Sequence, residues 1–139
     1  MAKTDNLKKQ HVEILTVARD INQQLGAMIS EESAAQIRRQ LSKMHGLVGL
    51  HLAMEDKSLY PSMLQSKDQQ ARELAQHYAK EMGDLAQTFE TYMKFWNNTT
   101  LISASAASFT EQTKAIFNAL SKRIHRENIQ LYPVADALP

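Results

Sequence analysis

The sequence predicts an all-α protein built as an up-down-up-down four-helix bundle, and three observations support this class. Apolar residues recur every three or four positions along most of the 139 residues, which is the spacing of one face of an α-helix. Proline occurs only at positions 61, 133 and 139, so long segments contain no helix breaker. No segment alternates apolar and polar residues as a half-buried strand does. Four helices with short connections form such a bundle, and we expect one domain over residues 1–139.

The first two predicted helices are each defined by one apolar stripe and one end signal. The first stripe covers residues 7–25 and ends near Gly26. The second covers residues 37–59. We expect Pro61 to end this helix, because proline has no amide proton and its ring clashes with the preceding turn.

The third predicted helix follows a sequence typical of a capping box. In that motif the side chains of Ser66 and Gln69 would each bond to the backbone of the other residue. The apolar stripe of this helix covers residues 74–92, and the polar cluster at residues 97–100 ends it.

The fourth predicted helix also follows a capping-box sequence, formed by Ser108 with Glu111. Its apolar stripe covers residues 116–131. Residues 101–107 fit either a turn or an early start of this helix, so the sequence leaves both possibilities open.

The end of the second predicted helix is repeated at the end of the fourth. Both segments contain a glutamate one turn before a Leu-Tyr-Pro ending. The matching positions are Leu52 and Ile124, Glu55 and Glu127, Asp56 and Asn128, Leu59 and Leu131, Tyr60 and Tyr132, and Pro61 and Pro133. The repeat differs where His51 corresponds to Arg123. Because alternate helices of the predicted bundle run in the same direction, we expect the two glutamates to face each other across the core.

The composition excludes several classes of function. Sixteen lysines and arginines against fifteen aspartates and glutamates leave a net charge of +1, which provides no basic surface for nucleic acid or anionic lipid. The absence of cysteine removes disulfides, thiolate metal sites and cysteine nucleophiles. No phosphate-binding loop or Gly-x-Ser-x-Gly motif occurs, and we expect a protein that is not an enzyme. A polar N-terminus and the lack of a membrane-spanning run predict a cytoplasmic protein with no membrane partner.

Imidazole and carboxylate side chains occur at positions where a core-facing stripe should be apolar. These positions are His11, His51, Glu55 and Glu127. Buried carboxylates need a metal ion or a cationic partner, and helical bundles build non-haem iron or manganese sites from such inward side chains. His51 and Glu55 have the i, i+4 spacing that puts two ligands on one helix face. The sequence therefore predicts a metal site at these residues.

Other residues leave alternatives open. His77 and Glu81, on the third predicted helix, are further candidate ligands, but an i, i+4 pair of this kind is also common on a solvated face. A single core histidine such as His11 can instead be satisfied by hydrogen bonds. Arg123 cannot bind a cation, because its guanidinium stays protonated, and a salt bridge from it to Glu127 would close the site without metal.

These motifs resemble those of the hemerythrin-like, or HHE cation-binding, family. Residues 51–61 read His-Leu-Ala-Met-Glu-Asp-Lys-Ser-Leu-Tyr-Pro, which is similar to the His-x-x-x-Glu and Leu-Tyr-Pro pattern of that family. Residues 10–14 resemble its first-helix histidine motif, and residues 127–133 resemble its last-helix ending. The resemblance covers nearly the whole chain.

The resemblance implies a left-handed four-helix bundle with a non-haem di-iron centre that binds oxygen or senses oxygen, nitric oxide or redox state. Matched residue by residue, it implies metal ligands at His11, His51, Glu55 and Glu127. Two positions depart from the pattern, because Arg123 and Met82 stand where the family has histidines. His77 or Glu81 would then have to complete the ligand set.

Two hypotheses about function follow. The first is a cation-binding module that uses one or two non-haem iron ions to bind or sense dioxygen, nitric oxide or redox state. The second is a metal-free helical regulatory or interaction module in which Arg123 neutralises Glu55 and Glu127. A signalling partner or a homo-oligomer is compatible with both hypotheses.

Overall fold

The computed structural model describes residues 3–139, and within this range the chain is helical with short connections and no strand. The long helices are α1 (Asp5–Asn22), α2 (Glu31–Met54), α4 (Gln69–Phe95) and α6 (Ala106–Arg126). Short elements extend or join them: the π-helical turns η1 (Glu55–Leu59) and η2 (Glu127–Leu131), and the helices α3 (Tyr60–Leu64), α5 (Thr99–Ala104) and α7 (Tyr132–Asp136). The all-α class predicted from the apolar periodicity is confirmed.

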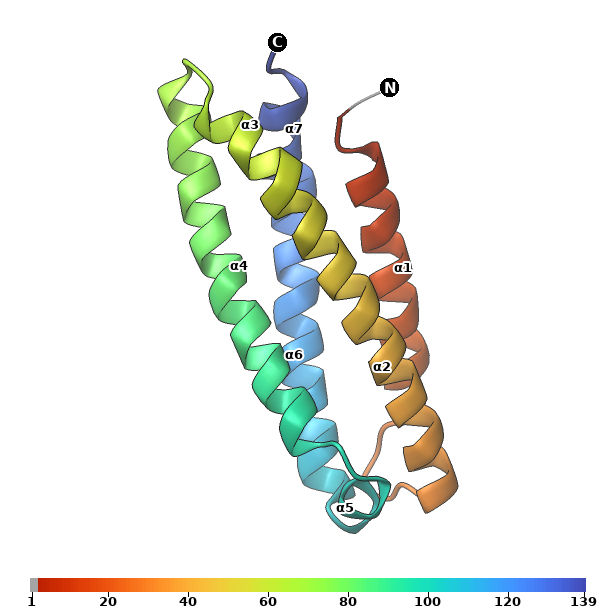
Figure 1. The fold of residues 1–139 in the computed structure, drawn as a ribbon. Coiled ribbons are helices and arrows are strands. Elements are labelled where there is room, and N and C mark those ends of the chain that lie inside the picture. Colours follow the sequence, from red (N-terminus) through yellow and green to blue (C-terminus); the bar gives the residue numbers. More distant parts are fainter. Residues whose placement is uncertain (1–2) are drawn as a thin grey trace.

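The long helices lie side by side as a bundle, as Figure 1 shows. In that view α1 and α4 run toward the end of the molecule that carries α5, and α2 and α6 run back toward the end that carries α3 and α7. A hydrogen bond joins the two terminal segments at the latter end, where the backbone amide of Thr4 donates to the side-chain Oδ1 of Asp136 at 3.1 Å. No helix within residues 3–139 has both the length and the apolar character needed to cross a membrane.

Two apolar clusters fill the bundle, one on each side of a polar layer. The larger cluster includes Ile14, Val48 and Ile124, and continues to the α5 end. The smaller cluster includes Leu7 and Leu131 and lies toward the termini. Leu7 and Ile14 lie on one face of α1 but belong to different clusters. The side chain of His11 lies between them on that face, and therefore at the boundary of the two clusters. That boundary is where the candidate site lies.

Pro61 does not end the second helix, which corrects the sequence-based expectation. Helical backbone continues through η1 into α3, where Pro61 is the second residue. In the widened turn the amide of Tyr60 donates to the carbonyl of Glu55, five residues earlier rather than four. This π turn accommodates Pro61, which has no amide proton, without ending the helix. The backbone of η2 repeats the arrangement, because the amide of Tyr132 donates to the carbonyl of Glu127.

The predicted capping box of the third helix is also wrong. The N-cap of α4 is Asp68, whose carboxylate accepts from the amide of Gln70 at 3.0 Å. Ser66 accepts from the amide of Asp68 instead, so it stabilises the turn that leads into the helix. The aspartate is one of the preferred N-cap residues, and it stands immediately before the first helical residue.

The second predicted capping box, Ser108 with Glu111, is wrong for a different reason. The helix α6 begins at Ala106, so Ser108 lies inside its first turn. Much of the open segment 101–107 belongs to a separate short helix, α5. Its N-cap Asn98 accepts from two amides of the first turn, at 2.8 and 3.1 Å. A turn-and-helix combination therefore joins α4 to α6.

Candidate metal centre

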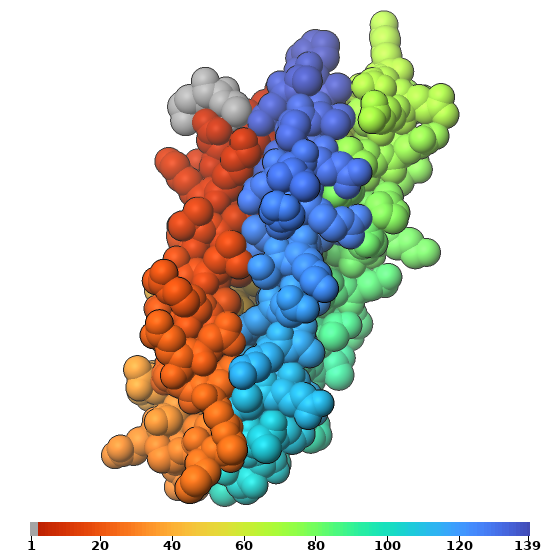
Figure 2. All heavy atoms as spheres, turned by 180° about the vertical axis from the view of Figure 1, so that it is seen from behind, coloured from red at the N-terminus to blue at the C-terminus, as the bar shows by residue number. Residues whose placement is uncertain are grey.

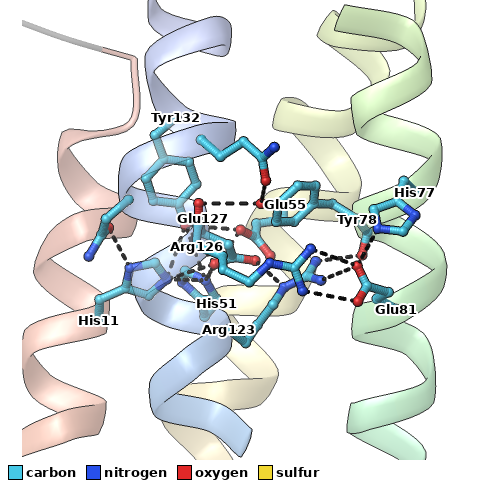
Figure 3. Close-up of polar contacts among 12 residues, drawn as sticks. His11, His51, Glu55, His77, Tyr78, Glu81, Arg123, Arg126, Glu127 and Tyr132 are labelled. Carbon is cyan, nitrogen blue, oxygen red and sulfur yellow. Dashed lines mark hydrogen bonds and ion pairs between the residues drawn. The ribbon is translucent and has the colours of Figure 1, made fainter.

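Four of the six predicted ligands meet in the polar layer between the two apolar clusters. His11 comes from α1 and His51 from α2, whereas Glu55 and Glu127 are the first residues of η1 and η2. Their exposed fractions are 1%, 3%, 0% and 1%, respectively. Figure 3 shows their side chains directed toward one another from these elements.

The nitrogen and oxygen atoms at the ends of these four side chains lie within contact distance of one another. The Nε2 atoms of His11 and His51 are 3.1 Å apart. Glu127 Oε1 lies 2.8 Å from His11 Nε2 and 3.5 Å from His51 Nε2. Glu55 Oε2 lies 3.3 Å from His51 Nε2. Two imidazole nitrogens and two carboxylate oxygens therefore share one small volume.

The outer nitrogens of both histidines are held by amide oxygens. His11 Nδ1 donates to Asn128 Oδ1 at 2.9 Å, and His51 Nδ1 donates to Gln10 Oε1 at 2.7 Å. An amide oxygen only accepts, so each Nδ1 carries a proton. When such an imidazole is neutral, its lone pair lies on Nε2 and is directed into the centre, as in histidines that ligate metals. Two lone pairs this close together require a shared proton or a cation between them.

Tyr132, from the second of the repeated Leu-Tyr-Pro endings, is a member of the centre that was not among the predicted site residues. Its hydroxyl lies 3.0 Å from Glu55 Oε2, 3.2 Å from Glu127 Oε1 and 3.1 Å from His11 Nε2. Burial, together with the negative charges of Glu127 and Glu55, raises the pKa of Tyr132 far above its usual value, so the phenol stays protonated. The Leu-Tyr-Pro repeat was the available signal for this residue.

The ionisable groups of the centre have strongly displaced pKa values. Burial alone would lower the pKa of His51, but hydrogen bonds with Glu127 and Glu55 outweigh it and raise the pKa to about 9. Burial raises the pKa of Glu55, against the opposing hydrogen bond from His51. Burial acts in the same sense on Glu127, yet hydrogen bonds from His11 and His51 and the charge of Arg123 hold its pKa well below the usual range.

Arg123 is buried beside this centre, with 6% of its side chain exposed. Its Nε donates to Glu127 Oε2 at 3.1 Å, on the side of the carboxylate that faces away from the histidines. Its Nη2 donates to the carbonyl oxygen of Tyr78, and its guanidinium carbon lies 4.3 Å from the centre of the Tyr78 ring. The salt bridge considered in the sequence analysis is therefore formed.

The structure does not bring His77 and Glu81 into the buried cluster. Their side chains are 61% and 38% exposed, and they pair with each other at 2.7 Å on the outer side of α4. Glu81 also accepts from Arg126 at 3.1 and 3.2 Å, which lowers its pKa. Glu81 reaches the centre only indirectly, through Arg123 Nη1 at 3.7 Å.

The residues present suit a transition-metal ion. Among residues 3–139, the group with the spacing to hold such an ion is His11, His51 and Glu127, whose donor atoms all lie within 4.8 Å of one another. Two imidazoles and one carboxylate form a ligand set known from non-haem Fe(II) sites, and imidazole also suits zinc. The fold and the site thus define a helical-bundle protein with a buried cluster of imidazole and carboxylate donors whose spacing suits a cation.

Comparison with known proteins agrees with this class. Residues 2–135 match the family model described as the hemerythrin HHE cation-binding domain, and the chain belongs to that family. The resemblance inferred from the sequence motifs is confirmed. No curated protein and no solved structure matches the chain.

Proposed function

We propose that this protein is a non-haem iron-binding module that holds one metal ion on His11, His51 and Glu127, with Glu55 beside them. The supporting fold is a left-handed up-down-up-down four-helix bundle that forms one domain. We infer a role in binding or sensing dioxygen, nitric oxide or redox state rather than in catalysis. The family supports cation binding, and the specific role is our proposal.

The observation that carries the proposal is the paired orientation of the two histidines. Amide oxygens fix both Nδ1 atoms as donors, so both Nε2 atoms face the centre, 3.1 Å apart, and each would offer a lone pair to a metal ion once it releases its proton. A satisfied core histidine needs no such arrangement, because it would direct one donor and one acceptor to different partners.

The residues of the chain would each contribute to holding the ion. Gln10 and Asn128 orient the two imidazoles, and the Tyr132 hydroxyl donates to Glu55 and so fixes that carboxylate. The apolar clusters on both sides exclude water from the layer. An iron ion with an open coordination position supplies a binding point for a diatomic molecule.

Metal binding by single-site variants tests this proposal. Purified protein is stripped of metal, and Fe²⁺ is titrated in calorimetry under argon, with elemental analysis of the loaded sample. We expect about one ion per chain and at least a tenfold weaker affinity for His51→Gln. The matched control is His77→Gln, which removes an exposed histidine and should bind as the unchanged protein does. Equal affinity in the unchanged protein and His51→Gln would contradict the assignment.

A second candidate function is a metal-free regulatory or interaction module, and the charge balance of the centre favours it. Arg123 and a protonated His51 supply two positive charges against the two carboxylates Glu55 and Glu127. The centre is therefore neutral without a metal ion. This candidate predicts no metal above background in well-folded protein and no change in thermal unfolding when Fe²⁺ is added.

A further inference from the structure

The sequence repeat at the two glutamates is also a repeat of backbone structure. Each glutamate begins a π-helical turn, η1 or η2, and a Tyr-Pro pair begins the short helix that follows. His51 and Arg123 therefore stand at the same place relative to their π turns, four residues before each glutamate. The half of the polar layer at η1 and the half at η2 therefore have the same backbone arrangement, with an imidazole (His51) in the first and a guanidinium (Arg123) in the second.

Glu127 connects the two halves through its two oxygens. Oε1 faces the histidines, at 2.8 Å from His11 Nε2. Oε2 faces the other way and accepts from Arg123 Nε at 3.1 Å. One carboxylate thus contacts the proposed metal position on one side and a fixed positive charge on the other.

The groups around Arg123 are those that would surround a bound cation. The guanidinium lies over the face of the Tyr78 ring, donates to the Tyr78 carbonyl oxygen and has Glu81 Oε2 at 3.7 Å. Its Nη1 is buried and makes no hydrogen bond to any group in residues 3–139. The surroundings are negatively charged or electron-rich, yet they do not match all five guanidinium donors.

We propose that the Arg123 guanidinium is a built-in cation that occupies the counterpart of the metal position and limits the centre to one metal ion. The inference rests on the proposed function for the half that contains His11 and His51. In this view a metal ion and an arginine are not alternatives, because each interacts with its own oxygen of Glu127. Replacing the guanidinium by a ligand should open a second metal position beside Glu127 and Glu81.

The test is the number of metal ions that each variant binds. Zn²⁺ serves as a redox-inert probe, and the stoichiometry is measured by calorimetric titration and by elemental analysis after desalting. The unchanged protein should bind one ion per chain and R123H two, because the introduced imidazole adds a ligand where the charge was. R123K keeps a cation there and should bind one. R126H is the matched control, since Arg126 bonds the same Glu81 from the surface, and it should also bind one.

Each result decides between the inference and the proposed function. Two ions in the unchanged protein, or one ion in both the unchanged protein and folded R123H, would overturn the inference and leave metal binding intact. No ion in the unchanged protein but one or two in R123H would contradict the proposed function and the inference together, because the inference requires one ion on the side of His11 and His51. No ion in either would contradict both.

Folding of R123H is followed separately by thermal unfolding with and without Zn²⁺. Zinc-dependent recovery of a cooperative transition, at two ions per chain, supports the inference. If R123H stays unfolded at every zinc concentration, R123Q takes its place, because glutamine removes the charge while keeping a polar side chain. In R123Q, an unchanged stoichiometry of one ion overturns the inference, and a second ion supports it.

Discussion

At the scale of single residues, the centre depends on charges that are buried together. Glu127 is almost fully buried, and its low pKa reflects donors on both of its sides. His11 and His51 contact one oxygen, and Arg123 contacts the other. Removing one partner from such a group leaves a buried charge without compensation, which costs far more than the loss of a surface ion pair.

Arg123→Met is therefore expected to destabilise the metal-free protein by about 3–5 kcal/mol. The measurement is urea unfolding of metal-free protein followed by circular dichroism. Arg126→Met provides the control, because this side chain is 42% exposed and its ion pair with Glu81 is worth less than about 1 kcal/mol. A similar small loss in both variants would show that Arg123 does not compensate the buried carboxylate.

The raised pKa of His51 predicts a pH dependence of the metal-free protein. His51 is faced by His11, Glu55, Glu127 and Tyr132. Because its pKa rises from 6.5 to about 9 on folding, the folded state binds the proton more tightly than the unfolded state. The resulting stability is fully present below pH 6.5 and is lost as the pH rises through 9, by about 3 kcal/mol in all.

Urea midpoints of metal-free protein, measured between pH 6 and pH 10, check this expectation. His51→Gln should remove most of the decline in that interval, because glutamine has no proton to lose. A decline of equal size in the variant would assign the pH dependence to other groups.

At the scale of elements, the π turns η1 and η2 set the direction of the side chains on either side of them. Each adds one residue to a helical turn, so the residues after it are rotated by about 100° relative to a continuous α-helix. This rotation is compatible with a buried glutamate at the start of the turn and a buried Leu-Tyr pair at its end. It also allows a proline to follow without ending the helix.

Deletion of the exposed Lys57 should convert η1 to an ordinary α-helical turn. Tyr60 and Met63, which are 4% and 0% exposed, would then turn away from the smaller apolar cluster. We expect a loss of unfolding free energy of at least about 3 kcal/mol, measured by urea unfolding, because large side chains leave the core. Lys57→Ala keeps the chain length and should change the stability by less than about 0.5 kcal/mol. A deletion variant as stable as Lys57→Ala would mean that the π turn has no structural role.

At the scale of the whole molecule, the proposed ligands join parts of the chain that are far apart in sequence. His11, His51 and Glu127 come from α1, α2 and η2, and α4 supplies none of them. A metal ion would thus connect three of the long segments near the end of the bundle that carries the termini. Figure 2 shows α1 and α6, which leads into η2, side by side on one face of the molecule.

Hydrogen exchange should therefore slow unevenly when metal binds. At a free metal concentration of about 100 times Kd, binding adds about 2.7 kcal/mol to the unfolding free energy. We expect local protection to increase in α1, the end of α2, and η1 and η2, with smaller changes in α4 and α5. Mass spectrometry of peptides with and without Zn²⁺ measures this pattern. Protection centred on α4 around His77 and Glu81 would place the metal on the outer pair instead.

The sequence predicted much of the fold, and it predicted part of the centre correctly. The helical periodicity identified His11, His51, Glu55 and Glu127 as inward residues, because each lies one turn from apolar neighbours on the same stripe. The same argument could not separate these residues from His77 and Glu81. Those two lie near the edge of the α4 stripe, where a small rotation of the helix decides whether a side chain faces the core or solvent.

By itself, the sequence determined the helical class, the repeated glutamate endings and the presence of charged groups on apolar stripes, because these follow from local spacing. Only the tertiary structure decided which groups meet. It placed Tyr132 beside Glu55, directed both histidine Nε2 atoms at each other and brought Arg123 against the carbonyl oxygen and ring of Tyr78. These contacts join residues from different helices, and their geometry depends on how the helices pack and rotate, which no local pattern specifies.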